Sequence, residues 1–520
     1  MTASQATAAP SRHGRTGAQL SRVDGPLKVT GGARFAAEVP LERLTYAALV
    51  PSAIARGRIT AIDTAAAEAA PGVVLVMTHA NAPRMRAPLT FAKDADKGGV
   101  AMAERAVMQD DRVHWNGQTV ALVLAETQEQ ASHAAGLIEI VYATEPASLD
   151  FAAAKAGAAA PESILGEPAT IAVGEAEAAL ASARHRVDRT YRTPRHNHCA
   201  IELHAVTVAW EGDDRLIVHD ASQALHQTRA TLAHVFGLDP ERVRVSSPFV
   251  GGGFGNKMPW DHHVLAIAAA KLARRPVRLV LSRAGVFLGT GGRTLSEQRV
   301  ALAARADGSG LAALLHTGVA ANSRINDWPE QFTFPARHLY AADTVKIGQE
   351  VLRLDMMANC PMRAPGESIG TFALESALDE LATAMAVDPI ELRLKSVAQL
   401  FHTLDPSPFR EGDLDTEAAA FVQRLNSYRA SMGLPALTPP RLLNQVAYDH
   451  SLDMGTRRYF DHTNLRGQSP CDRMRLAGYP NGNAENIAAG NATAAATFEQ
   501  WRTSPGHNTN MLNRSSRAIG

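Results

Sequence analysis

The chain is organised around the stretch Phe249-Val-Gly-Gly-Gly-Phe-Gly-Asn-Lys257. The alternating residues Val243-Arg-Val245 before it predict a strand, and Pro259 to Ala273 after it has the apolar spacing of a helix with proline at its start. A strand, a glycine loop and a helix start gather backbone N–H groups around one concavity, where an anion or an oxo group could be held. A tight turn without a ligand is the simpler interpretation of three glycines, and this loop alone leaves both open.

Two familiar phosphate motifs are excluded by inspection. A Walker loop needs Ser or Thr after its lysine, where this sequence has Met258. A dinucleotide-binding G-x-G-x-x-G that starts at Gly251 needs glycine where Asn256 stands. The loop therefore predicts a backbone anion site of another kind, or a structural turn.

A second loop of similar character lies further along the chain. Met362-Arg-Ala-Pro-Gly-Glu367 opens an amphipathic helix predicted over Ser368 to Met385, which places a cationic side chain at a helix N-terminus. With Ala221-Ser-Gln223, these loops resemble the molybdopterin-binding large subunit of the xanthine dehydrogenase and aldehyde oxidase family. The stretches at 276–283 and 388–394 are similar to that family in the same order, and bacterial aldehyde-oxidising subunits resemble the chain most.

The resemblance covers roughly residues 20 to 398 and implies a cofactor site. Backbone of the two loops would hold the dithiolene and oxo groups of molybdopterin, in its cytosine dinucleotide form or a closely related one, and Gln223 would donate a hydrogen bond to an oxygen ligand of molybdenum. The expected cofactor-binding residues are Gln223, Gly252, Gly253, Phe254, Gly255, Arg363 and Ala364. The resemblance also implies iron–sulfur and FAD subunits as partners, and a small aldehyde or heteroaromatic substrate that is hydroxylated with oxygen from water.

The resemblance stops after Lys395-Ser-Val-Ala398. In the family, a second cofactor domain continues from there and supplies a glutamate that acts as the catalytic base. We expect that base and most of that domain to lie outside this chain. No catalytic residue is therefore assigned, and the chain alone is expected to retain little cofactor and to have doubtful activity.

The remaining sequence has a different character. Its distinctive stretches are Tyr459-Phe-Asp-His462, Ala484-Glu-Asn-Ile-Ala488, Phe498-Glu-Gln-Trp501 and Ser504-Pro-Gly-His507. They resemble the bacterial branch of the CAP superfamily, the cysteine-rich secretory, antigen 5 and pathogenesis-related proteins, which form an α-β-α sandwich. The resemblance implies a cavity with two histidines and one or two glutamates, and His462, Glu485 and His507 fit that set, while Ser504 replaces a second glutamate.

Two histidines and a carboxylate that converge in a groove could hold a divalent metal, typically zinc. A hydrogen-bonded structural cluster of the same residues is the alternative, and the sequence favours neither. The sandwich is expected to be incomplete, because the sequence stops where its last strand should begin.

These interpretations together predict a multidomain chain of α/β and α+β class. The expected order is a disordered arm (1–28), a hammerhead-type α/β domain (29–148), a first molybdopterin-binding domain (160–398), a linker (399–414) and an incomplete α-β-α CAP sandwich (415–520).

Composition limits the partners. Lys and Arg number 52, as do Asp and Glu, so the formal charge of zero favours neither nucleic acid nor an anionic membrane as a partner. The 3 cysteines form no C-x-x-C pair, which excludes an iron–sulfur cluster held by this chain alone. The polar first twenty or so residues show no secretory signal, and a cytoplasmic location is expected. Two other interpretations stay open: a CAP-domain binding protein of unknown ligand, and a non-functional fusion or assembly product.

Overall fold

The computed structural model describes residues 21–326, 328–397, 416–439, 441–457, 459–465, 467–477, 479, 484–488, 493–514, 516 and 518. The chain forms two compact units, the first Met1–Arg337 with Ala342–Lys395, the second His338–Ala341 with Ser396–Gly520. Of the expected disordered arm, residues 1–20 lie outside the described residues, and Gly25–Val29 forms the short helix α1. The expected linker at 399–414 also lies outside them.

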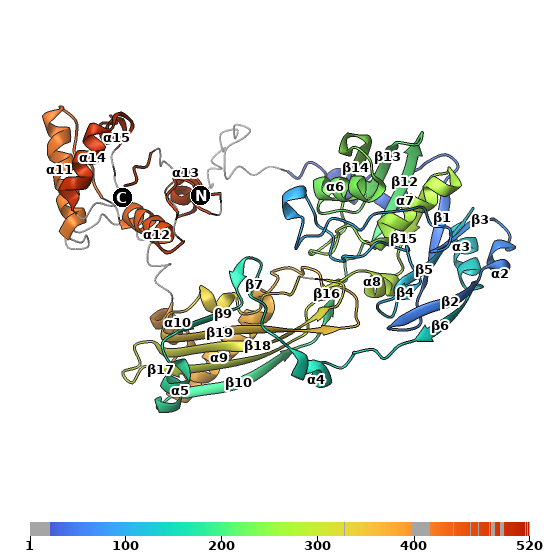
Figure 1. Ribbon diagram of the computed structural model, residues 1–520, viewed down its shortest axis with the longest axis horizontal. Coiled ribbons are helices and arrows are strands. Elements are labelled where there is room, and N and C mark those ends of the chain that lie inside the picture. The colour runs from blue at the N-terminus through green and yellow to red at the C-terminus, as the bar shows by residue number, and fades with distance from the viewer. Residues whose placement is uncertain are drawn as a thin grey trace, which may run out of the picture. The chain divides into compact units, whose positions relative to one another are not determined.

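A seven-stranded mixed sheet is the largest sheet that the described residues of the first unit form (Figure 1). Its strands in spatial order are β14 (Val243–Ser246), β13 (Arg215–Asp220), β12 (Ala205–Glu211), β15 (Val277–Val280), β1 (Thr45–Pro51), β5 (Thr119–Ala125) and β3 (Val73–Thr78). Strand β1 pairs in parallel with β15, with Thr45 opposite Val277. Three strands from the first part of the chain therefore extend a sheet whose other strands come from the region of the glycine loop.

The structure divides the strands of the expected hammerhead-type α/β domain (29–148) between two sheets. While β1, β3 and β5 join the large sheet, β2 (Gly57–Asp63) pairs with β4 (Arg112–Val113) and β6 (Glu139–Thr144) in a separate three-stranded sheet. Two short ladders join β11 (His196–Asn197) to β16 (Gly292–Arg293) and β7 (Ser163–Ile164) to β8 (Glu167–Pro168). The local hydrophobic pattern predicts that a strand exists. Which strand it pairs with depends on contacts between residues that are distant in sequence.

A five-stranded sheet is the second large sheet of the first unit. Its order is β10 (Arg186–Thr193), β17 (Ser296–Ala304), β18 (Leu311–Ser323), β19 (Ala342–Leu354) and β9 (Thr170–Val173). Strands β17 and β18 pair as an antiparallel hairpin. Helix α9 (Glu367–Met385) packs on β10 and β17, and its buried face runs from Ile369 to Ala382. This packing fixes the start of α9, where the second predicted loop ends.

The other helices of the first unit cover the sheets or connect their strands. They are α2 (Ala65–Glu68), α3 (Gln128–Ala135), α4 (Phe151–Ala154), α5 (Ala176–Ser182), α6 (Leu225–Phe236), α7 (Asp261–Ala273), α8 (Arg283–Gly289) and α10 (Pro389–Ser396), with 3₁₀ turns η1 (Ala36–Glu38), η2 (Ala95–Lys97), η3 (Lys155–Gly157), η4 (Pro240–Arg242) and η5 (Pro335–Arg337). Helix α7 is buried continuously from His262 to Ala270, because its sequence is apolar nearly all round and it packs on β12 and β15.

The described part of the second unit is helical. Its helices are α11 (Thr416–Ser431), α12 (Arg441–Arg457), α13 (Pro470–Leu476), α14 (Ala494–Thr503) and α15 (Pro505–Met511). Leu425, Leu437, Phe498 and Met511 form its core. In place of the expected β layer, the described residues between 416 and 518 show one parallel bridge, between Thr438 and Ala518.

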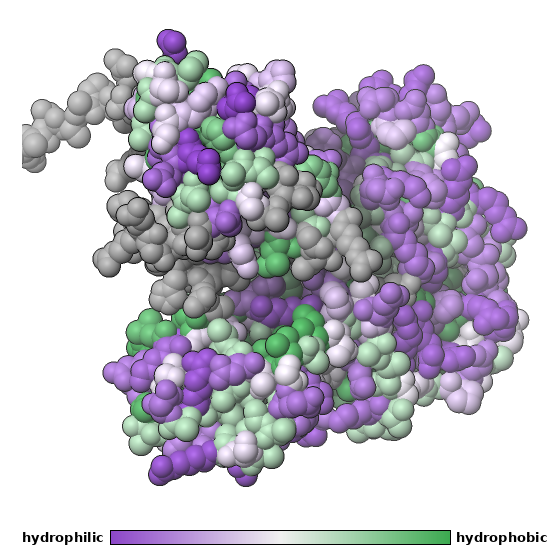
Figure 2. All heavy atoms as spheres, turned by 60° about the vertical axis from the view of Figure 1, so that its left-hand side comes forward, coloured by the Kyte–Doolittle hydropathy of each residue, from purple (hydrophilic) through white to green (hydrophobic). Residues whose placement is uncertain are grey.

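Hydrophilic residues cover much of the face shown in Figure 2, with small hydrophobic groups between them. Among the described residues, none of the helices has both the length and the apolar content that crossing a membrane requires.

Candidate functional site

The glycine loop (Phe249 to Lys257) connects β14 to the buried helix α7, as the sequence predicts. Three of its residues have left-handed backbone conformations, with φ of 94° at Gly252, 54° at Phe254 and 104° at Gly255. A non-glycine residue seldom adopts a positive φ, and such conformations are typical of functional loops whose surroundings hold them in place. Phe254 is 48% exposed, so its ring lies at the surface of the loop.

Gln223 and Gly253 are packed against each other. A Cβ atom added at Gly253 would lie 2.1 Å from Gln223 Oε1, so a larger residue there would displace the glutamine. Gln223 Oε1 accepts hydrogen bonds from the backbone N–H groups of Gly255 at 3.0 Å and Lys257 at 3.3 Å. Because both partners are donors, the atom that faces them is the amide oxygen, and the Gln223 NH₂ group faces away from the loop backbone.

The arginine loop (Met362 to Glu367) lies directly against the glycine loop. The Arg363 N–H donates to Phe254 O at 2.9 Å. A Cβ at Gly255 would lie 2.1 Å from Pro361 O, so only glycine permits this approach of the two backbones. Ala364, beside Arg363, has a φ of 56°. The structure thus brings all the predicted cofactor-binding residues into one cradle, and Arg363 and Ala364 are exposed on it.

A buried ion pair supports the glycine loop. Lys257, with a fully buried side chain, pairs with the Glu202 carboxylate, and Glu202 Oε2 also accepts the Gly251 N–H at 2.6 Å. Burial lowers the pKa of the Lys257 ammonium, while Glu202 opposes that shift. Each partner offsets the desolvation of the other, so a largely buried charged contact holds the loop.

A second buried ion pair supports the arginine loop. Arg293 Nη1 donates to Glu330 Oε1 at 2.7 Å, and the two side chains are 4% and 0% exposed. Glu330 also accepts the backbone N–H groups of Thr294 at 3.0 Å and Gly366 at 2.8 Å. Burial raises the pKa of Glu330, and Arg293 opposes that shift. The sequence analysis did not identify Glu202, Lys257, Arg293 or Glu330 as site residues, because nothing local marks a charged residue as buried.

Histidines near the loops make structural contacts. His198 Nε2 lies 3.0 Å from Pro361 O, and His204 Nε2 lies 3.2 Å from Asn256 O. His263 Nε2 lies 2.8 Å from Asp220 Oδ1 while its Nδ1 accepts the Trp260 N–H. Because Nδ1 accepts this N–H, the ring proton lies on Nε2, which donates to Asp220 and so links the end of β13 to the start of α7.

In the second unit, the structure brings together two of the three predicted metal ligands. His462 Nδ1 lies 2.9 Å from Glu485 Oε2, and Arg473 Nη2 donates to Glu485 Oε1 at 2.5 Å. His507 instead contacts Ser504 Oγ at 2.8 Å and stacks on Trp501. Across the part of the chain that is described, no three His, Cys, Asp or Glu side chains gather as metal ligands would. Zinc binding at these residues stays a prediction.

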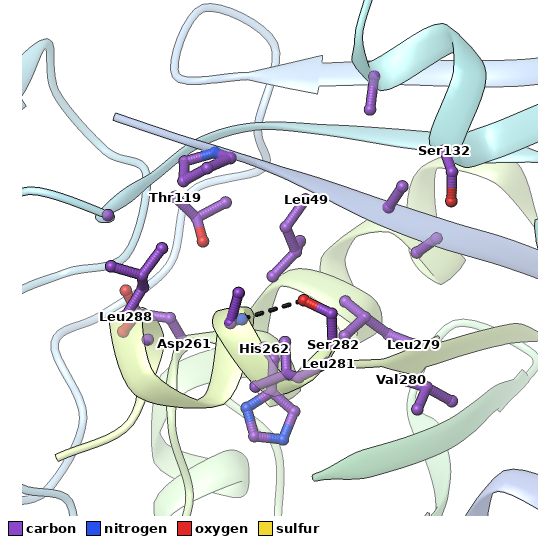
Figure 3. A pocket seen from close by; sticks show the side chains of 18 of the residues that line it. Leu49, Thr119, Ser132, Asp261, His262, Leu279, Val280, Leu281, Ser282 and Leu288 are labelled. Atoms are coloured by element: carbon purple, nitrogen blue, oxygen red, sulfur yellow. Dashed lines mark hydrogen bonds between the residues drawn. The ribbon is translucent and has the colours of Figure 1, made fainter. Parts of the chain in front are cut away.

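A separate cavity of about 290 Å³ lies in the first unit, lined by β1, α3, β15 and α8 (Figure 3). Its lining is mainly apolar, with Leu49, Leu281 and Leu288 among the side chains, and the Ser282 hydroxyl caps α8 by accepting the Gly285 N–H at 3.0 Å. None of the predicted cofactor-binding residues lines this cavity. It therefore belongs to the packing between strand β1 and helix α8 and is separate from the cradle.

Comparison with known families agrees with the order of the motifs. Residues 30–146 match the aldehyde oxidase and xanthine dehydrogenase a/b hammerhead domain, and residues 158–397 match the molybdopterin cofactor-binding domain. Residues 422–520 match the cysteine-rich secretory protein family. The expected multidomain fold class is confirmed, although the exact domain boundaries stay predictions.

Curated relatives give the same result. The aldehyde oxidoreductase molybdenum-binding subunit PaoC of Escherichia coli O157:H7 is 35% identical over 382 residues, which are 73% of this chain and 50% of that protein. The xanthine dehydrogenase molybdenum-binding subunit of the same organism is 30% identical over 390 residues, covering 73% of this chain and 51% of that protein. The chain spans about half the length of these relatives.

A solved structure shows the same fold. Quinoline 2-oxidoreductase from Pseudomonas putida 86 matches with a TM-score of 0.66 and 23% identity, over 80% of this chain and 56% of that one. The family matches and the curated relatives show that residues 30–146 and 158–397 belong to the hammerhead and molybdopterin-binding domain families of the aldehyde oxidases and xanthine dehydrogenases, and that a segment of the cysteine-rich secretory protein family follows them.

Proposed function

We propose that the first unit contributes the hammerhead domain and one face of the cofactor site to a molybdenum hydroxylase that acts on small aldehydes or heteroaromatic compounds. The observation that carries this proposal is the joining of the glycine and arginine loops, with Gln223, into one cradle through the Arg363 N–H to Phe254 O bond at 2.9 Å. When bound, the cofactor supplies the redox chemistry by which oxygen from water enters a substrate C–H bond.

The residues present fit a polyanionic pterin with oxo groups. The Gln223 amide oxygen is held by the loop, so its NH₂ group is available as a donor on the exposed side of the cradle. Because φ is positive at Phe254 and Ala364, the peptide groups next to these residues point in directions that ordinary backbone angles would not give them. Donors fixed in this way bind an anion without the entropy loss of ordering long side chains.

Each part of the cradle has a distinct task under this proposal. Gln223 orients the oxo face of the cofactor, the loop backbones bind its anionic groups, and the exposed Phe254 ring shields the site and contacts a planar substrate. We also propose that the pterin is in its cytosine dinucleotide form. Separate iron–sulfur and FAD subunits would carry electrons away from it. Support for partner subunits comes from relatives that are themselves named as molybdenum-binding subunits.

Molybdenum content tests the proposal. The full chain, produced in a host that makes the cofactor, should carry molybdenum below one atom per chain, because the described cradle covers only one face. Gly253→Ala, whose Cβ meets Gln223, should lower that content several-fold. Gln223→Glu keeps the oxygen that accepts from Gly255 but loses the NH₂ donor, so it should lower molybdenum with little change in melting temperature.

The matched control is Gly289→Ala at the end of α8. A Cβ there has no heavy atom within 4 Å, so this variant should keep the wild-type molybdenum content. Metal analysis by mass spectrometry measures all four proteins. Equal molybdenum in the wild type, Gly253→Ala and Gln223→Glu would contradict the assignment of this cradle as the cofactor site.

A further inference from the structure

Arg293 contacts three consecutive carbonyl groups of the arginine loop. Its Nη2 donates to Met362 O at 3.1 Å and to Arg363 O at 2.7 Å, and its Nη1 donates to Ala364 O at 3.3 Å. A planar guanidinium with several fixed N–H groups can do this, whereas an ammonium acts as one point charge. One buried side chain therefore sets the orientation of three successive peptide planes.

The direction of those carbonyls determines where the N–H groups point. In a trans peptide the N–H is antiparallel to the carbonyl of the same plane, and no cis peptide bond occurs among the described residues. The Met362 carbonyl points to Arg293, and the Arg363 N–H of the same plane donates to Phe254 O on the opposite side. The Arg363 carbonyl also points to Arg293, so the Ala364 N–H must point toward the same side as the glycine loop.

Glu330 makes this arrangement possible. It offsets the buried charge of Arg293 and accepts the Gly366 N–H at the start of α9, which ties the loop to the helix. Gly366 has a φ of 83°, and a Cβ there would lie 2.3 Å from Gln331 O, so the loop and the segment of Glu330 are in close backbone contact. The orientation of the loop thus rests on two charged side chains separated by 37 positions in sequence.

We propose that Arg293, held by Glu330, is the positioning residue that turns the Arg363 and Ala364 N–H groups toward the cofactor side of the cradle. The Arg363 N–H, oriented in this way, donates to Phe254 O in the glycine loop. Ala364 N–H has no acceptor among the described residues, and its acceptor is an anionic or oxo group of the cofactor. This second part rests on the proposed function, since it requires the cofactor to occupy the cradle.

Hydrogen exchange in the full chain tests the first part. In Arg293→Lys the charge opposite Glu330 remains but the three carbonyl contacts cannot all form, so the Arg363 amide should exchange on the order of ten-fold faster than in the wild type. Residue-resolved exchange by mass spectrometry measures this amide directly. Arg105→Lys is the matched control, because Arg105 forms a largely enclosed pair with Asp261 and hydrogen-bonds no residue of either loop. In this variant the Arg363 amide should keep the wild-type rate.

A second variant addresses folding. Arg293→Met combined with Glu330→Gln removes both charges at similar volume, so neither a buried unpaired charge nor a large cavity remains. This double variant should also show faster exchange at Arg363. An unchanged rate at Arg363 in both Arg293→Lys and the double variant would overturn the positioning role.

Molybdenum content separates this inference from the proposed function. Faster exchange in Arg293→Lys together with less molybdenum than in Arg105→Lys supports both parts. Faster exchange with undiminished molybdenum would overturn the role of Ala364 as a cofactor donor. If the proposed function itself fails, the wild type will contain no more molybdenum than Gly253→Ala, while the Arg363 amide still responds to Arg293→Lys.

Discussion

Gln223, Glu202 and Arg293 each contact more than one group of the cradle with one side chain. Gln223 accepts two N–H groups, Glu202 accepts one N–H and the Lys257 ammonium, and Arg293 donates to three carbonyls. A side chain that satisfies several backbone groups at once fixes their relative orientation, which a single contact does not. The rigidity that a cofactor site needs therefore comes from a few polar residues behind the exposed surface.

The burial of a single histidine, His316, predicts that the stability of the folded state depends on pH. Its side chain is fully buried on β18 with Nε2 2.9 Å from Gln298 Oε1, and burial lowers its pKa to about 3. The unfolded state takes up a proton below about pH 6.5 and the folded state does not, so stability is lost as pH falls through this window. Between pH 7.5 and pH 5 the loss from this residue should be about 2 kcal/mol.

Urea melts of the first unit at the two pH values measure this loss. His316→Gln should show a pH dependence smaller by about that amount. His226→Gln, at an exposed position on α6, serves as the control and should behave as the wild type. The same pH dependence in His316→Gln and the wild type would show that this histidine is not kept neutral by burial.

At the scale of elements, helix α9 is placed by glycine as well as by its apolar face. Gly370 lies in the first turns of α9, where a Cβ would lie 2.0 Å from Phe332 O and 3.0 Å from Pro335 Cδ. The helix therefore approaches the 332–335 segment at backbone distance, and this contact sets the position of the arginine loop at its start. An apolar pattern predicts the helix and its buried face but not this approach.

Gly370→Ala should consequently destabilise the protein, although alanine in an exposed helix interior usually stabilises by about 1 kcal/mol. Overpacking against a backbone carbonyl typically costs about 1–3 kcal/mol, so the melting temperature of the first unit should fall by at least ~2 °C. Ser376→Ala on the same helix removes a hydroxyl that bonds Phe372 O, and it should leave the melting temperature unchanged or slightly higher. Differential scanning calorimetry compares the two, and a rise for Gly370→Ala would refute the close approach.

At the scale of the whole molecule, the chain contains separate apolar cores. The first unit has its main core between the seven-stranded sheet and α6 and α7, while Leu425, Leu437, Phe498 and Met511 form the core of the second unit. Each core is formed by residues of its own unit alone. Two units with separate cores are expected to unfold in separate cooperative transitions.

Phe498→Ala tests this organisation by calorimetry. Removal of this buried ring should cost about 3–5 kcal/mol and lower only the transition of the second unit. Tyr448→Ala is the control, because this side chain on α12 is 60% exposed, and the midpoints of both transitions should stay at their wild-type temperatures. A single transition that shifts as a whole with Phe498→Ala would mean that the two units unfold together.

Much of the local structure could be predicted from the sequence. The strand before the glycine loop, the buried helix after it and the helix that follows the arginine loop all lie within a few residues of their predicted bounds, because hydrophobic period and proline position are local signals. The family resemblance identified Gln223, Phe254 and Arg363, which the structure then brings together. No local signal could show that these loops touch.

The sequence by itself determined the order of elements, the two glycine-dependent loops and the domain families of residues 30–146 and 158–397, since each depends on short stretches that carry their own pattern. Only the tertiary structure decided that β1 joins β15 in one sheet, that Glu202 and Arg293 are buried beneath the loops, and that His507 lies apart from the contact between His462 and Glu485. Charged and polar residues are usually exposed, so their burial in pairs follows from how distant segments pack, which periodicity and spacing do not encode.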